Sequence, residues 1–417
     1  MAKNHLWVEA VVVDVGVDLV VDRVVDLVDD FSFKFYSIKE KYDGIDMKDE
    51  YLQKQIITYM GNKRKLLPNI ESILKDVCVK LGKDTLRSGD AFSGSGIVAR
   101  LLKRYSSELY VNDRASYSTT LNRCYLSSPN DEEYAKIVGY VDEANKYVHE
   151  GHVHEGHLHG GGVGDCVSYI EKNWASETRR YYTKENGGII DRYRGFIGSI
   201  PDEYRCYLMA NLLVKCSINN NTNGHFSAFY KDDTGEGKYG GKNGVDTKRI
   251  TKKIVLENPV LCVNECRSEI SCMDTNEWVS TIPELDVVYI DPPYNKHPYS
   301  IYYFMLDIIN DLSMQDIPET TRGQPMGWER SDYNSYRNAE AAFADLIKKI
   351  RAKFLIISYS NKGIIPVDKL ESILATKGVV TRHEIDHKTY NKLEGLGDYK
   401  RTAEKNKTVE YLWVVAS

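Results

Sequence analysis

The chain has 417 residues, of which 42% are hydrophobic and 28% charged. This balance is that of a folded globular protein and excludes wholesale disorder, and the length indicates one large domain with a second structural unit. The formal net charge of −5 argues against a protein that coats nucleic acid non-specifically, because neutralising phosphates requires clustered Lys and Arg.

The first fifty residues contain a valine-rich run at 11–28 that carries an aspartate at every fourth position: Asp14, Asp18, Asp22 and Asp26. These charges interrupt any membrane-spanning stretch, and the run lacks the basic start of a signal peptide. We therefore expect a peripheral amphipathic helix in an N-terminal segment 1–50 and no membrane partner. The eight cysteines form no C-x-x-C pair, which favours reduced thiols and a cytoplasmic protein.

A short basic element follows at residues 59–67, with the sequence YMGNKRKLL, before a helix expected at 68–81. Lys63, Arg64 and Lys65 make one of three basic clusters, the others lying at 248–253 and 400–407. Such a cluster is compatible with a local nucleic-acid face or with an ordinary solvated helix start.

From residue 55 onward, short apolar runs alternate with helical stretches, which is typical of βαβ units in a parallel sheet. We expect strands at 86–92, 108–111 and 285–290, a fourth at 354–358 after a helix at 338–351, and an edge strand at 409–415. The first three end in acidic or glycine-rich residues. Open α/β sheets bind ligands at these carboxyl ends.

The turn after the first strand combines Asp90, Phe92, Ser93, Gly94, Ser95 and Gly96, and opens a helix expected at 97–104. Alternate glycines allow close approach of the backbone to a ligand, and a helix start offers free N–H groups. Asp113 ends the next strand, where a carboxylate can accept both hydroxyls of a ribose or can cap a helix. Because Ala99 replaces the third glycine of G-x-G-x-x-G, the turn differs from a dinucleotide site.

Between residues 126 and 257 the alternation of strands and helices is lost. This segment holds a His/Gly tract at 149–162, a helix-like stretch at 202–215 and a Gly/Asn/Lys-rich run at 219–244. An insertion of this size is better explained as a second module than as a loop. No acidic or cysteine pattern completes a metal site around the histidines, so we expect a loop there and no metal.

The strongest motif is Asp291-Pro292-Pro293-Tyr294, directly after the buried run at 285–290. An aromatic amine is a poor nucleophile, because its lone pair is conjugated with the ring. Asp291 and the carbonyl of Pro292 can each accept one of its N–H groups, while the two prolines stiffen the turn. Tyr294 offers a ring on which a base taken out of a duplex can stack.

This tetrapeptide resembles the signature of the amino-methyltransferase superfamily. Residues 59–67 are similar to the Y-x-G-x-K-x-x-L element that begins the D12-class DNA adenine methyltransferases. The order of this element, the glycine turn, a large insertion and D-P-P-Y matches their α arrangement. Asn62, and Ser93 and Ser95 within the glycine turn, depart from the usual pattern, and none of these departures removes a required group.

The resemblance implies a Rossmann-like methyltransferase sheet that binds S-adenosylmethionine. It places the cofactor against Tyr59, Gly61, Lys63, Asp90, Phe92, Ser93, Gly94, Ser95, Gly96, Asp113 and Asp274, and catalysis at Asp291, Pro292, Pro293 and Tyr294. Tyr302 and Tyr303 are further candidates for the base pocket, or else packing residues. The implied organisation is a catalytic domain at 51–125 and 258–417 with a target-recognition module at 126–257.

The resemblance also implies the reaction, which is methylation of adenine N6 in double-stranded DNA at a specific site. A role in restriction–modification or genome marking follows for a bacterial or phage-encoded protein, with a cognate endonuclease as a partner. We expect a monomer or a homodimer. The alternatives are an N4-cytosine or RNA amino-methyltransferase, and a DNA-binding subunit whose active site has decayed.

Overall fold

The computed structural model describes residues 49–150, 168–313, 316–317, 319–326, 331–387 and 408–417. The valine-rich run at 11–28 and the His/Gly tract after His149 lie outside these residues, so the predictions made for them stay open. His149 itself belongs to helix α6, and its Nε2 lies 3.0 Å from the carbonyl oxygen of Ile254. No helix within the described ranges is long and apolar enough to cross a membrane.

A seven-stranded sheet forms the centre of this structure, in the order β3-β2-β1-β4-β5-β7-β6. Its strands are β1 (Leu86–Asp90), β2 (Ser106–Asn112), β3 (Arg267–Ser271), β4 (Leu285–Ile290), β5 (Ala352–Ser360), β6 (Val379–His387) and β7 (Thr408–Ala416). The strands β1 to β5 pair in parallel, and β7 pairs antiparallel with both β5 and β6. The predicted α/β class with a Rossmann-like sheet is confirmed.

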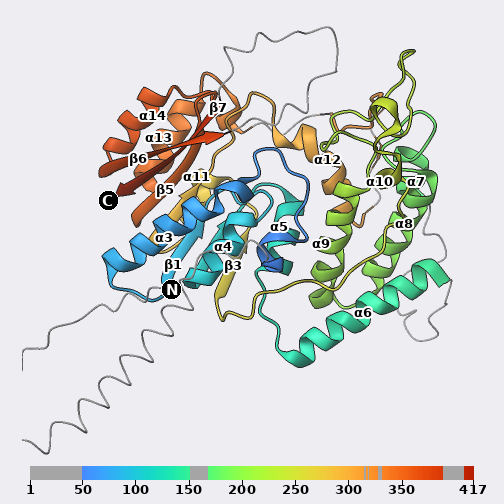
Figure 1. Cartoon of the computed structure of the whole chain (residues 1–417), viewed down its shortest axis with the longest axis horizontal. Helices are drawn as coiled ribbons and strands as arrows, with labels where there is room; N and C mark the ends of the chain where they lie inside the picture. The colour runs from blue at the N-terminus through green and yellow to red at the C-terminus, as the bar shows by residue number, and fades with distance from the viewer. Residues whose placement is uncertain (1–48, 151–167, 314–315, 318, 327–330, 388–407) are drawn as a thin grey trace, which may run out of the picture. The chain divides into compact units, whose positions relative to one another are not determined.

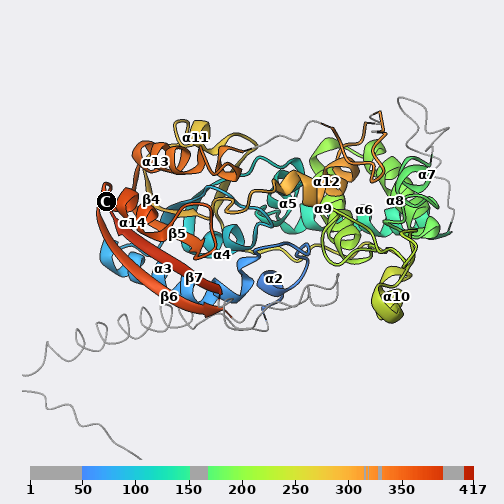
Figure 2. The same cartoon turned by 90° about the horizontal axis from the view of Figure 1, so that it is seen from above.

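Helices cover both faces of the sheet. Figure 2 shows α11 and α13 on one side and α3 on the other. These helices and their neighbours are α2 (Glu50–Gln53), α3 (Leu67–Leu81), α4 (Ile97–Tyr105), α5 (Ser116–Tyr125), α11 (Thr275–Trp278), α12 (Tyr299–Asn310), α13 (Ala339–Lys349) and α14 (Val367–Ala375), with the 3₁₀ turns η1 (Lys63–Leu66) and η4 (Asp332–Asn334). Because both faces are covered, every residue of β4 is buried, which explains its continuous apolar run.

Two features of the sheet differ from the expectation. The closing strand is not an edge strand, because β7 lies between β5 and β6. The edges are β6 and β3, and neither was predicted. Both are rich in charged or polar side chains, with the sequences VVTRHEIDH and RSEIS, since an edge strand needs less apolar cover than a central one.

The segment between α5 and β3 contributes helices and no strand of the sheet in its described part. These helices are α6 (Asp131–Glu150), α7 (Tyr169–Trp174), α8 (Lys184–Ser199), α9 (Asp202–Ile218) and α10 (Thr247–Ile250), with the 3₁₀ turn η3 (Lys242–Gly244). They lie together beyond α5 and α12, away from α13 and α14 (Figure 1). Apolar side chains of α6 to α9 share one core with Leu121 of α5 and Phe304 of α12.

The order of the strands fixes where a ligand can bind. After β1 the chain builds outward through β2 and β3, and then returns to the other side of β1 with β4 and β5. Such a reversal leaves a crevice at the carboxyl ends of the two central strands. The backbone N–H of Ala91 donates to the carbonyl of Tyr289 at 3.0 Å, so the ends of β1 and β4 lie side by side. The glycine turn and D-P-P-Y follow these two strand ends.

Candidate active site

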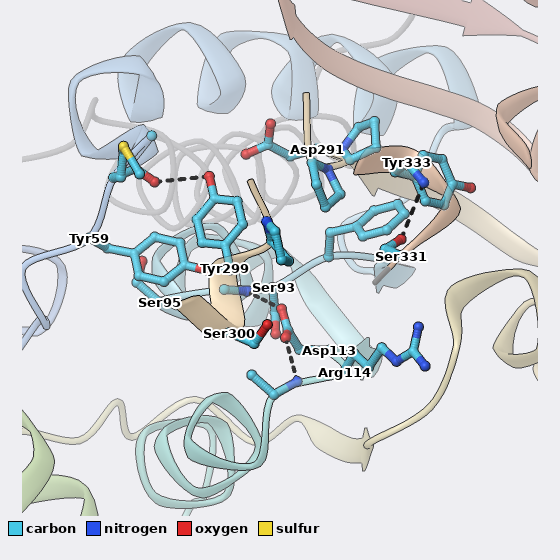
Figure 3. Close-up of a pocket in the computed structure, with 18 of the residues that line it drawn as sticks. Tyr59, Ser93, Ser95, Asp113, Arg114, Asp291, Tyr299, Ser300, Ser331 and Tyr333 are labelled. Carbon is cyan, nitrogen blue, oxygen red and sulfur yellow. Dashed lines mark hydrogen bonds between the residues drawn. The ribbon is translucent and has the colours of Figure 1, made fainter. Parts of the chain in front are cut away.

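A cavity of about 450 Å³ lies at this crevice and is lined from both strand ends. All the predicted site residues line it except Gly96: Tyr59, Gly61, Lys63, Asp90, Phe92, Ser93, Gly94, Ser95, Asp113, Asp274, Asp291, Pro292, Pro293 and Tyr294. In Figure 3, Tyr59 and Tyr299 lie on one side of the cavity and Tyr333 and Ser331 on the other. The volume is in the range of pockets that hold a cofactor-sized molecule.

The glycine turn is held in shape by its neighbours. Gly94 has a φ of 52°, and a Cβ built there would lie 2.9 Å from Cε1 of Tyr59. Glycine is therefore needed both for the backbone conformation and for the close contact with the ring. Gly96 has a φ of 77° at the start of α4, where a Cβ would lie 2.6 Å from Oδ1 of Asn122. Gly96 shapes the turn from outside the cavity.

Asp113 follows β2 and connects the glycine turn to the start of α5. Its Oδ2 accepts a hydrogen bond from the backbone N–H of Gly94 at 2.7 Å, and its Oδ1 accepts one from Ala115 at 2.9 Å. Burial raises the pKa of this carboxyl, and the N–H groups of Ala115, Gly94 and Arg114 lower it in part. The carboxylate is therefore anchored by backbone donors while it borders the cavity, with acceptor capacity left for a ligand.

An aromatic wall stands beside this carboxylate. The rings of Phe92 and Tyr333 meet edge to face with centroids 5.2 Å apart. The hydroxyl of Tyr333 donates to Oδ1 of Asn276 at 2.7 Å, which fixes its ring. Asp274 lies at the same side, where it caps α11 by accepting from the N–H of Asn276 at 2.9 Å. This part of the cavity offers flat apolar surface next to polar acceptors.

The D-P-P-Y turn contributes a carboxylate with a buried cation beside it. Nζ of Lys63 lies 3.2 Å from Oδ1 of Asp291 and 3.9 Å from Oε2 of Glu410. The same ammonium lies 5.4 Å from the centroid of the Tyr294 ring, which meets Tyr359 edge to face at 5.7 Å. The side chain of Lys63 is only 6% exposed, so this member of the basic cluster faces the cavity rather than solvent.

These charges set the protonation of Asp291. Burial raises the pKa of Asp291 to about 6, Lys63 lowers it and Glu410 raises it further. Burial alone would lower the pKa of Lys63, but the carboxylates of Asp291 and Glu410 outweigh it and raise that pKa above its usual value. Lys63 is therefore an ammonium, and Asp291 changes its charge close to neutral pH.

Tyrosines of α12 hold the 59–67 element against the cavity. The ring of Tyr59 stacks with Tyr299 at 5.2 Å and with Tyr303 at 4.7 Å, because residues four apart share one face of a helix. The hydroxyl of Tyr303 accepts from the N–H of Met60 at 2.6 Å. Neither Tyr302 nor Tyr303 is among the residues that line the cavity, and the hypothesis that they contact the target base stays a prediction. Tyr303 is a core packing residue, and Tyr299 occupies the cavity wall.

Comparison with known proteins assigns a family to this geometry. The sequence profile of the D12 class N6 adenine-specific DNA methyltransferases matches residues 59–362, which is well over half of the chain. The match spans all three motifs that line the cavity. The chain belongs to this family. This family is specific for adenine N6 in DNA, whereas the motifs alone were also compatible with methylation of cytosine N4 or of RNA.

Several relatives are similar to this chain over most of its length. The Type II methyltransferase M.NlaIII of Neisseria lactamica is 25% identical over 368 residues, which cover 86% of this chain and 99% of the relative. M.CviAII of Paramecium bursaria Chlorella virus 1 is 24% identical over 344 residues, covering 79% and 92%. M.FokI of Planomicrobium okeanokoites is 25% identical over 366 residues, and this chain spans about half of its length (52%).

Some residues of this D12-class site belong to none of the sequence motifs. Tyr333 and Asn334 come from the turn η4, far along the chain from the glycine turn, and Glu410 comes from β7. Asp307 of α12 also lines the cavity, four residues after Tyr303 and eight after Tyr299. The residues of α12 that line the cavity recur at intervals of three and four, which was a usable signal because it marks one helix face: Tyr299, Ser300, Phe304, Asp307 and Ile308. The others meet the site only through tertiary folding.

Proposed function

We propose that this D12-class enzyme transfers a methyl group from S-adenosylmethionine to the N6 amine of a specific adenine in double-stranded DNA, in the α arrangement of motifs. The observation that carries the proposal is the shared cavity. Asp113 and the glycine turn at one end and the D-P-P-Y turn at the other border the same space. A donor held at the first would therefore meet an acceptor held at the second.

The residues present fit S-adenosylmethionine. Asp113 keeps acceptor capacity toward the cavity for ribose hydroxyls, and Phe92 and Tyr333 offer flat apolar surface for an adenine ring next to Asp274. Tyr59, Gly61 and Lys63 border the same space from the 59–67 element. When bound, the cofactor supplies an electrophilic methyl group on a sulfonium, whose carbon–sulfur electron pair stays on sulfur as the carbon–nitrogen bond forms.

The protein's part in the reaction is to position and polarise the amine. Asp291 and the carbonyl of Pro292 each accept one N–H, which draws the nitrogen lone pair out of conjugation with the ring. Because two prolines hold this turn, both acceptors keep their direction. Once the nitrogen is methylated it is cationic, and it loses a proton to Asp291 or to water. Tyr294 stacks on the base, which must leave the duplex to enter the cavity.

The helical segment within 126–257 is the proposed target-recognition module. Its helices α6 to α9 share a core with α5 and α12, which begin shortly after Asp113 and Tyr294 respectively. If this module binds DNA, it does so while packed against α5 and α12, the two helices next to the site. The relatives are named as Type II methyltransferases and modification methylases, which supports a role in restriction–modification with a cognate endonuclease.

The test is to incubate the purified protein with methyl-tritiated S-adenosylmethionine and plasmid DNA from a methylation-deficient host. We expect labelled N6-methyladenine in the nucleoside digest, and sequencing of methylated bases should place it in one sequence context. Label in 4-methylcytosine, or only in an RNA substrate, would overturn the proposal. If an Asp291→Ala variant methylates DNA as fast as the wild type, Asp291 does not act in catalysis and that part of the proposal is wrong.

A further inference from the structure

Glu410 is a buried acidic residue that lies outside the residues matched by the family profile. It stands near the start of β7, and the residue is only 7% exposed. In the pairing of β5 with β7 it lies opposite Ser360, two positions beyond the pair of Ser358 with Leu412. Directly opposed residues point to the same face of a sheet. Burying an ionised carboxylate is unfavourable unless a partner offsets it, so its presence here needs a reason.

The partner is the ammonium of Lys63. The distance from its Nζ to Oε2 of Glu410 is 3.9 Å, and that oxygen accepts no hydrogen bond from any described residue. The same ammonium lies 3.2 Å from Oδ1 of Asp291. One buried cation from η1 is therefore shared by two carboxylates, one from the end of β4 and one from β7.

We propose that Glu410 is a positioning residue of the methyl-transfer site, which shares the Lys63 ammonium with Asp291 and thereby leaves Asp291 free to accept the target amine. The inference rests on the proposed function, because it takes Asp291 as the amine acceptor. It assigns a role in the reaction to a strand that follows the motif region of the chain.

The charge balance explains the effect. With Lys63 protonated and both carboxylates ionised, the three groups carry a net charge of −1. If Glu410 were neutral, the ammonium would compensate Asp291 alone and weaken it as an acceptor. The excess negative charge also favours the amine nitrogen as it becomes cationic, in a buried site where charges are weakly screened. Glu410 thus provides the second anion that a single Lys–Asp pair would lack.

Other groups also face Asp291, and they contribute to its titration. They are Asp90 at the end of β1, Tyr289 of β4, and Tyr294 and Tyr299 after the D-P-P-Y turn. Asp90 is a buried carboxyl and the other three groups are tyrosine hydroxyls, so none of them is a cation. Among the described residues, Lys63 is the cation nearest to Asp291. Removing the charge of Glu410 should therefore lower the pKa of Asp291, since it removes a repulsion without removing the cation.

The first experiment compares Glu410→Gln and Glu410→Asp with a control, Glu384→Gln. Glu384 lies on the neighbouring strand β6, is exposed and pairs with Arg382. We expect Glu410→Gln to lower kcat roughly tenfold, the size of a one-unit change in a pKa, with little change in the KM for S-adenosylmethionine. The acid limb of its pH profile should move to lower pH. Glu410→Asp should keep the limb in place, and Glu384→Gln should behave as wild type.

The second experiment needs no activity. In protein labelled with ¹⁵N-lysine, an ammonium held between buried carboxylates exchanges its protons slowly and gives a protected resonance. We expect that resonance to be absent in Lys63→Met, weakened in Glu410→Gln and retained in Glu384→Gln. This measurement separates the two proposals, because it reports the Lys63 environment even if the protein methylates no DNA.

Three results would contradict the positioning role of Glu410. A wild-type enzyme that forms N6-methyladenine while Glu410→Gln keeps the wild-type kcat and acid limb would overturn the inference and leave the proposed function standing. An unprotected Lys63 ammonium in the wild type would also overturn it. A fall in kcat with an unmoved pH limb and a lowered melting temperature would assign Glu410 to stability alone.

Discussion

The pH dependence of methylation provides a sharp test of the site, because burial and neighbouring charges place the pKa of Asp291 at about 6. Asp291 accepts the amine only when ionised, so activity should fall as the pH is lowered through that value. A group with this pKa is about nine-tenths ionised at pH 7 and about one-tenth at pH 5, so kcat/KM should fall about tenfold over that interval.

A second carboxyl near the cavity, that of Asp307, titrates in the same pH range, so the acid limb must be assigned to one of the two groups. Burial also raises the pKa of Asp307 to about 6, and Ser116 lowers it in part. Wild-type data alone therefore do not distinguish the two groups. We expect Asp291→Asn to lower kcat/KM by roughly two orders of magnitude and to remove the acid limb, because an amide does not titrate. Asp307→Asn should keep the limb.

The assay is initial-rate transfer of tritiated methyl groups to DNA between pH 5 and pH 8, at constant ionic strength and with both substrates below saturation. Under these conditions the profile reports groups of the free enzyme. Asp368→Asn is the control, since Asp368 lies in the first turn of α14 and does not line the cavity. An acid limb that persists unchanged in Asp291→Asn and disappears in Asp307→Asn would refute the reasoning.

Three further predictions concern binding and stability. Asp113→Ala removes the proposed ribose acceptor and should weaken S-adenosylmethionine binding by roughly 10- to 100-fold in calorimetry, an effect that an unchanged Kd would contradict. Gly94→Ala places a side chain at a φ of 52° against the ring of Tyr59, and it should lower the free energy of unfolding by about 1–2 kcal/mol, measured by thermal unfolding. The control is Gly139→Ala in α6, where a Cβ meets nothing within 4 Å, and this variant should be as stable as the wild type or more stable. Asp307→Ala should cost about 1 kcal/mol in urea unfolding, because Oδ1 of Asp307 accepts from the first two residues of α5 and acts as its cap; wild-type stability would exclude that role.

The sequence alone was sufficient for the central strands and for several of the helices that flank them, but not for β3, β6 or most helices of the 126–257 segment. The strand at 285–290 and the helices after residues 67, 96 and 338 follow from apolar runs and their periodicity, because those patterns reflect burial of a single segment. The motifs were found for the same reason. A glycine turn or a D-P-P-Y turn is a property of a few consecutive residues, and its place at the end of a strand is visible in the sequence.

Tertiary structure decided which of these elements meet. The position of β7 between β5 and β6 depends on pairing with residues far away in the chain, and no local pattern distinguishes that strand from an edge strand. The same is true of the charges. Lys63, Asp291 and Glu410 are each more than a hundred residues apart in the chain, yet their interaction depends on separations of a few ångströms. Residue types identify the chemistry of the site, whereas Coulomb forces and pKa values depend on distances that only the fold determines.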